Sequence, residues 1–99
     1  LVEKYMGIDQ IIDKLVGKLG DVSSAYIIGD YANGIDSGLI DLVLVGNINI
    51  NELDRIVDKR GKELSRKIRT LILTKNELLK LWNKLEMDKS LLIWGNHLK

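Results

Sequence analysis

The chain has no cysteine and a single histidine, and each scarcity excludes a class of site. Without cysteine it cannot form disulfides, cysteine-ligated zinc sites or a catalytic thiolate. His97 alone cannot supply a Ser-His-Asp triad or a multi-histidine metal site from this chain. The sequence also lacks an apolar run of about 18 residues and a charged-then-apolar leader. These absences predict a cytoplasmic domain with no membrane partner.

The chain also lacks a large excess of either positive or negative charge. The net charge is +1, from 15 basic and 14 acidic residues, so the composition does not indicate binding to nucleic acid. We expect DNA binding only through a domain outside this chain. A hydrophobic content of 45% excludes intrinsic disorder. The length of 99 residues predicts one domain over residues 1–99. Because Leu1 already lies in an apparent helix, we expect a fragment of a longer protein.

Hydrophobic spacing predicts alternating helices and strands. A helix is expected over residues 8–19 and is expected to end at Gly20. Two further helices are expected after Asn49 or Asn51 and after Thr74, each opened by a capping box. Strands are expected over residues 25–28, 39–45, 68–73 and 90–94. This order predicts the α/β (α+β) class, with a small mixed sheet of three to four strands and helices packed mainly on one face.

The most informative stretch is residues 25–46. A strand ends at Gly29, a small-residue turn follows, and Asp41 lies among apolar residues in the next strand. A carboxylate in a half-buried strand costs several kcal/mol unless it is paired, ligated or facing water. Asp41 therefore needs a partner, a metal or solvent.

Residues 29–34 and 37–46 resemble the nucleotidyltransferase fold of DNA polymerase beta and the minimal nucleotidyltransferases. That family has Gly-Ser at a strand end, a short turn, and then Asp-x-Asp in the next strand. Further weak matches before the first helix and around the third strand resemble a subgroup in which the domain follows a winged helix in transcriptional regulators. The resemblance implies a nucleotidyltransferase-like sheet and a site at this turn.

The sequence departs from the family pattern at three places. Leu39 stands where the first strand aspartate is expected, and only Asp41 remains of the pair. Asp30 replaces the phosphate-binding serine, and a carboxylate there repels a triphosphate by roughly 3–4 kcal/mol at 4–5 Å. The third family carboxylate has no counterpart in residues 68–71. A two-metal site needs more ligands than one surviving acid.

The candidate site residues each have two interpretations. Asp41 is a vestigial catalytic and metal-binding residue or a relic carboxylate at the sheet end that is hydrogen-bonded or exposed to water; Asp30 is a substitute ligand or the N-cap of the turn over residues 31–33. Asp36 is a loop acid that reaches the site or an ordinary turn residue. The resemblance assigns nucleotide binding to Gly29, Asp30, Gly34 and Ser37, whereas the glycines also suit tight turns. No cofactor is expected, except Mg²⁺ if the domain is an active enzyme.

A basic cluster and two tryptophans complete the candidates. The cluster is either a phosphate or nucleic-acid contact or a solvated surface, and it comprises Lys59, Arg60, Lys62, Arg66, Lys67 and Arg69. Trp82 is expected in the core, together with inward-facing Leu78, Leu79, Leu81 and Leu85. Trp94 is either core or part of a strand that pairs across a dimer, and His97 is expected in a tail.

Two classes of function remain open at this level. The first is a domain that keeps the fold, has lost catalysis and serves as a ligand-sensing or dimerisation module of a winged-helix regulator. Its partners would be a nucleotide and a second copy. The second is an active nucleotidyltransferase that transfers a nucleoside monophosphate to a hydroxyl through Asp41 and Asp30, or an antitoxin of the minimal-nucleotidyltransferase type.

Overall fold

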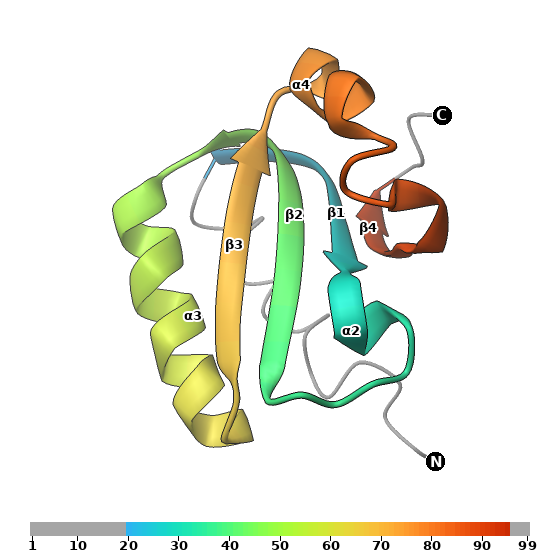
Figure 1. Ribbon diagram of the computed structural model, residues 1–99. Helices are drawn as coiled ribbons and strands as arrows, with labels where there is room; N and C mark the ends of the chain where they lie inside the picture. Colours follow the sequence, from blue (N-terminus) through green and yellow to red (C-terminus); the bar gives the residue numbers. More distant parts are fainter. Residues whose placement is uncertain (1–19, 96–99) are drawn as a thin grey trace.

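The computed structural model describes residues 20–95, and these form a mixed four-stranded sheet in the order β3-β2-β1-β4 (Figure 1). β1 is antiparallel to both β2 and β4, whereas β2 and β3 are parallel. A parallel pair requires a crossover connection, which helix α3 supplies. The predicted α/β class with a small mixed sheet is confirmed, whereas the two longer helices of residues 20–95 pack on opposite faces of the sheet rather than mainly on one. The strands are β1 (Gly20–Ile28), β2 (Leu39–Ile48), β3 (Lys67–Leu73) and β4 (Leu91–Gly95).

Two helices, over residues 50–64 and 75–81, begin where the sequence predicted them. Asn49 caps α3 (Ile50–Leu64), and its side chain accepts hydrogen bonds from two backbone N–H groups. Thr74 opens α4 (Lys75–Leu81) with a complete capping box, because the Glu77 side chain also accepts from the Thr74 N–H. The predicted box at α3 is only half formed, since Glu52 forms an ion pair with Arg55 instead.

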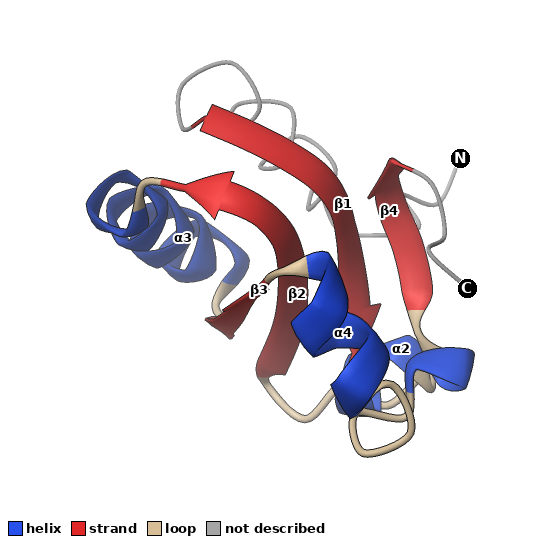
Figure 2. Ribbon diagram, turned by 90° about the horizontal axis from the view of Figure 1, so that it is seen from above, coloured by secondary structure: helices blue, strands red, loops and turns tan. Residues whose placement is uncertain are grey.

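Alternation along the strands divides the core into two clusters on opposite faces of the sheet. On one face, Ala25 and Ile27 pack with Leu53 and Val57 of α3. On the other face, Tyr26 packs with the residues of α4 and the turns after it. Figures 1 and 2 show α3 alongside the β3 side of the sheet and α4 across one end of the other face. Among residues 20–95, no helix covers the other end of the sheet face on which α4 lies.

Several boundaries differ from the predictions. β1 begins at Gly20, five residues before the predicted strand, because residues 20–22 pair with the end of β2. The turn after β1 contains a short helix, α2 (Gly29–Ala32). α4 ends at Leu81, and Leu79 is exposed rather than buried. A 3₁₀ turn (Met87–Lys89) precedes β4. The helix predicted over residues 8–19 and His97 lie outside the described residues.

Candidate functional site

The turn between β1 and β2 positions Asp41 through a glycine. Gly29 has a φ of +74°, a conformation that residues with a side chain rarely adopt. A Cβ at Gly29 would lie 3.0 Å from Asp41 Oδ2, so the backbone of the turn and the carboxylate approach closely. Ile28 is the register partner of Asp41 in β1. The strand end, the turn and the acid thus meet as the sequence resemblance implied.

Asp41 is paired by an arginine of the neighbouring strand. Its register partner in β3 is Arg69. Arg69 Nε donates to Asp41 Oδ1 at 2.7 Å, and Nη2 donates to Oδ2 at 3.0 Å. The hydrogen bonds that Arg69 donates to Asp41 raise the pKa of Arg69 further above its already high value. Both carboxylate oxygens are therefore held by one guanidinium, a strong and geometrically specific arrangement.

The residues next to Asp41 on the same face of the sheet do not form an acidic cluster. Leu39 lies two residues before Asp41 and shares its face, and its register partner in β3 is Lys67. Lys67 in turn shares a face with Arg69. Where the family pattern places three carboxylates, this chain therefore presents one carboxylate with two cations. Among residues 20–95, no group of three or more His, Cys, Asp and Glu side chains is arranged to hold a metal ion.

Asp30 lies in the first turn of α2, but it does not cap that helix. The N-cap position is Ile28, and no side chain makes a capping hydrogen bond there. The N-cap interpretation of Asp30 is therefore wrong, because the helix begins two residues earlier than expected. The charge of Asp30 contributes to the raised pKa of Arg69, which places this exposed carboxylate within electrostatic reach of the Asp41–Arg69 pair.

Asp36 has a structural partner far along the chain. Arg66 Nε donates to its two carboxylate oxygens at 3.0 and 3.1 Å, and Nη2 also bonds Oδ2. The Arg66 hydrogen bonds, helped by the Gly38 N–H, hold the pKa of Asp36 below its usual value. Lys67 N–H donates to Gly38 O at 2.9 Å beside this pair. The ion pair of Asp36 with Arg66 thus connects the α2–β2 loop to the beginning of β3. The interpretation of Asp36 as an ordinary turn residue did not include this long-range partner.

The remaining candidates are two residues of the α2–β2 loop and the arginines of the basic cluster. Gly34 has a φ of +81° with open space around it, and Ser37 is exposed in the same loop, so their assignment to nucleotide binding stays a prediction. Three arginines of the basic cluster are in ion pairs, namely Arg60 with Glu63, Arg66 with Asp36 and Arg69 with Asp41.

The predicted core role of Trp82 is confirmed. This side chain is buried, lies edge-on to Tyr26 and donates from Nε1 to Asp88. Trp94 is half-buried in β4, where it packs against the cluster on the α3 face. The core interpretation therefore holds for Trp82, and the pairing of β4 across a dimer stays a prediction for Trp94.

A cavity of about 210 Å³ lies over the Asp41–Arg69 pair. Its floor contains the pair itself, and its walls are mainly apolar. Arg69 leaves about half of its side chain exposed there, while Asp41 is 26% exposed. The lining residues are Ile28, Asp41, Leu42, Arg69, Thr70 and Leu71. This arrangement offers an apolar recess with a neutralised carboxylate.

Comparisons with known proteins give one informative likeness. No protein-family profile matches the chain, and no curated protein sequence matches it. The fold is similar to a solved chain described as "Crystal structure of the toxin-antitoxin with AMP-PNP", with a TM-score of 0.62. The two chains are 14% identical, and the match covers 90% of this chain and 74% of that one. This likeness shows that the two chains share a fold. No helix in residues 20–95 has the length and apolar character needed to cross a membrane.

Proposed function

We propose that this chain is a nucleotidyltransferase-like domain without catalytic activity, which acts by binding as a ligand-sensing or dimerisation module of a transcriptional regulator. The observation that carries the proposal is the bidentate pair of Asp41 with Arg69. Mg²⁺ is held by hard oxygen ligands in near-octahedral geometry. Here a covalently attached cation occupies both oxygens of the one surviving acid.

The chemistry of the surrounding face supports the same conclusion. A two-metal mechanism needs carboxylates on both sides of the metals to hold them about 3.5–4 Å apart. Leu39 supplies no oxygen, and Lys67 and Arg69 repel a second cation. The residues present therefore do not fit a divalent metal pair, and no catalytic step is derived through one.

A second candidate function is that of an antitoxin of the minimal-nucleotidyltransferase type. The similarity of fold to a chain from a toxin–antitoxin structure favours it. This candidate is a variant of the active nucleotidyltransferase, so in contrast to the first it is compatible with chemistry at Asp41. The flanking gene sequence separates them, because an upstream helix-turn-helix supports the regulator and an adjacent toxin-like gene supports the antitoxin.

The test is a search for nucleotide-dependent stabilisation and transfer. A ligand at 100 times its dissociation constant stabilises a folded protein by about 2.7 kcal/mol. We expect no dependence on Mg²⁺ in any thermal shift caused by the four nucleoside triphosphates, and no transfer of labelled nucleoside monophosphate. Asp41→Asn keeps the shape of the side chain and removes its charge. Transfer that disappears in this variant would establish the active enzyme instead.

A further inference from the structure

The outer edge of β3 has unused backbone hydrogen-bonding groups. β3 is one of the two terminal strands of the sheet, and its Lys67 N–H points inward, to Gly38 O. Because successive residues of a strand direct their N–H and C=O groups to opposite sides, Ile68, Thr70 and Ile72 direct theirs away from β2. Within residues 20–95, no strand pairs with this edge. An exposed row of this kind is a template for another strand.

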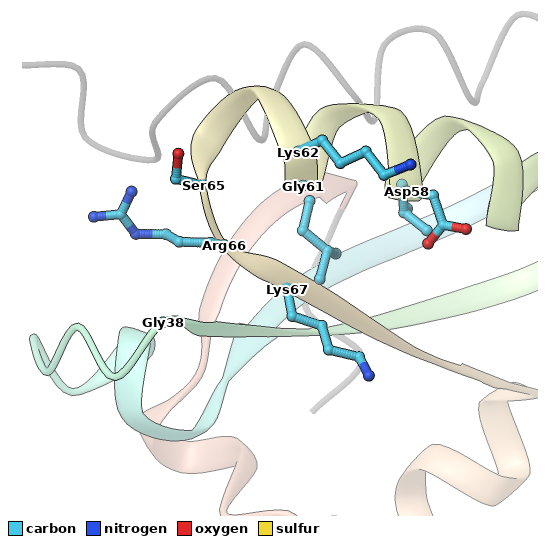
Figure 3. A pocket seen from close by; sticks show the side chains of 9 residues that line it. Gly38, Asp58, Gly61, Lys62, Ser65, Arg66 and Lys67 are labelled. Atoms are coloured by element: carbon cyan, nitrogen blue, oxygen red, sulfur yellow. The ribbon is translucent and has the colours of Figure 1, made fainter.

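A cavity adjoins this edge. It measures about 440 Å³ and lies between the last turns of α3 and the beginning of β3. Gly61 forms part of its wall, at a point where a Cβ would meet Arg66 O at 2.7 Å, so helix and strand are already as close as backbones allow there. Figure 3 shows Asp58 and Lys62 on the helix and Lys67 on the strand around this space. The edge is thus bordered by a helix along one side.

The lining of the cavity carries one acid, Asp58, against Lys62, Arg66 and Lys67, so this border of the β3 edge has an excess of positive charge. Arg66 lines the cavity but is paired with Asp36, and Figure 3 shows its side chain extending in the opposite direction from Lys62. Lys62 and Lys67 form no ion pair with another residue of the described part of the chain. They also lie on different sides of the β3 edge, since Lys62 belongs to α3 and Lys67 shares the face of Arg69, away from the helix.

We infer that the β3 edge binds an extended segment of a protein partner, which adds as an antiparallel strand and carries two successive acidic residues at its C-terminal end. An antiparallel strand brings its C-terminal end to the beginning of β3, where both lysines lie. Because successive side chains of a strand point to opposite faces, one acid faces Lys62 beside α3 and the next faces Lys67. Backbone pairing supplies affinity and the two charges supply register, as in other edge-strand complexes. The inference rests on the binding role proposed above and names its partner surface.

The experiment uses the 99-residue chain and a synthetic octapeptide of alternating valine and threonine that ends in two glutamates. Titration is followed by amide hydrogen exchange and by ¹⁵N chemical shifts. We expect new protection at the Thr70 and Ile72 amides. The Arg69 and Leu71 amides point toward β2 and should change little. Protection spread evenly along β3, or confined to another strand, would overturn the proposal.

Charge variants test the register. Lys62→Glu and Lys67→Glu should each weaken binding about tenfold, as expected when an attractive surface contact becomes repulsive. Replacing one peptide glutamate by glutamine should abolish the effect of one lysine variant and leave that of the other. Lys80→Glu, on the exposed side of α4, is the matched control and should leave binding unchanged. Equal weakening by all three variants would mean non-specific attraction and would contradict the inference.

A second copy of the chain is the competing occupant. If the protein alone forms a dimer whose Thr70 and Ile72 amides are already protected, the partner proposal fails. This outcome is separate from the test of the proposed function, because nucleotide turnover reports on Asp41 and peptide binding reports on the β3 edge.

Discussion

Substitution of Gly29 by alanine tests how closely the turn and Asp41 approach each other. Gly29 has a φ of +74°, and a Cβ there would lie 3.0 Å from Asp41 Oδ2. Placing a residue with a side chain in this left-handed region costs about 1–2 kcal/mol. Crowding against the carboxylate, which Arg69 holds in place, adds to this cost. We therefore expect Gly29→Ala to destabilise the fold by about 2 kcal/mol in total.

Gly34→Ala is the matched control. Its φ of +81° carries the same backbone penalty, but no atom lies within 4 Å of the Cβ position. Its expected cost is about 1 kcal/mol. For a domain of this length, each kcal/mol lowers the melting temperature by about 4–8 °C, so thermal and urea denaturation resolve the two variants.

A double-mutant cycle isolates the contact. In an Asp41→Ala background the carboxylate is absent, so Gly29→Ala should cost only the backbone penalty and match Gly34→Ala. The expected interaction energy between Gly29→Ala and Asp41→Ala is about 0.5–1 kcal/mol. If Gly29→Ala and Gly34→Ala cost the same in the wild-type background, the close approach deduced from the structure is wrong.

Three further predictions follow from packing, capping and charge. Leu53→Ala, in the fully buried core, should lower the free energy of unfolding by about 2–5 kcal/mol in urea titrations, whereas Leu79→Ala, at an exposed position, should change it by less than about 0.5 kcal/mol. Thr74→Ala removes the side-chain acceptor of the capping box and leaves the bond from the residue 74 N–H to Glu77, so it should cost about 1 kcal/mol, and equal stability of this variant and wild type would contradict the cap. The pKa of Asp36 is lowered from 3.8, so its ion pair with Arg66 stabilises the fold above that value and loses the contribution as the pH falls through the lower, folded-state pKa. Arg66→Met should return the Asp36 pKa, followed by carboxyl NMR, toward 3.8, and an unchanged titration would contradict the pairing.

The sequence predicted the elements whose signals are local. The caps at Asn49 and Thr74 were read from single side chains that bond backbone two or three residues away, and the structure confirms them. The expected strand over residues 25–28 was too short, because residues 20–22 are extended only by pairing with the end of β2. That pairing comes from tertiary structure and leaves no periodic signal in the residues themselves.

In the candidate site, too, local features could be predicted and long-range pairs could not. The meeting of Gly29 with Asp41 followed from the family resemblance, which covers both strand ends. The partner of Asp41 could not be deduced, because Arg69 lies 28 residues further along the chain and reaches the acid only through the parallel register of β2 and β3. Likewise, Arg66 lies 30 residues from Asp36. The basic cluster was visible in the sequence, but its division into paired arginines and two lysines at a sheet edge required the fold.

The central claim is that Arg69 takes the place of a metal ion on Asp41, and binding of Mn²⁺ measures it most directly. Electron paramagnetic resonance of Mn²⁺ with wild-type protein, with Asp41→Asn and with the double variant Leu39→Asp/Arg69→Asp compares one, none and three carboxylates on the same scaffold. The account predicts no specific Mn²⁺ binding by the first two and measurable binding by the third. Tight Mn²⁺ binding by the wild type that is lost in Asp41→Asn would contradict it.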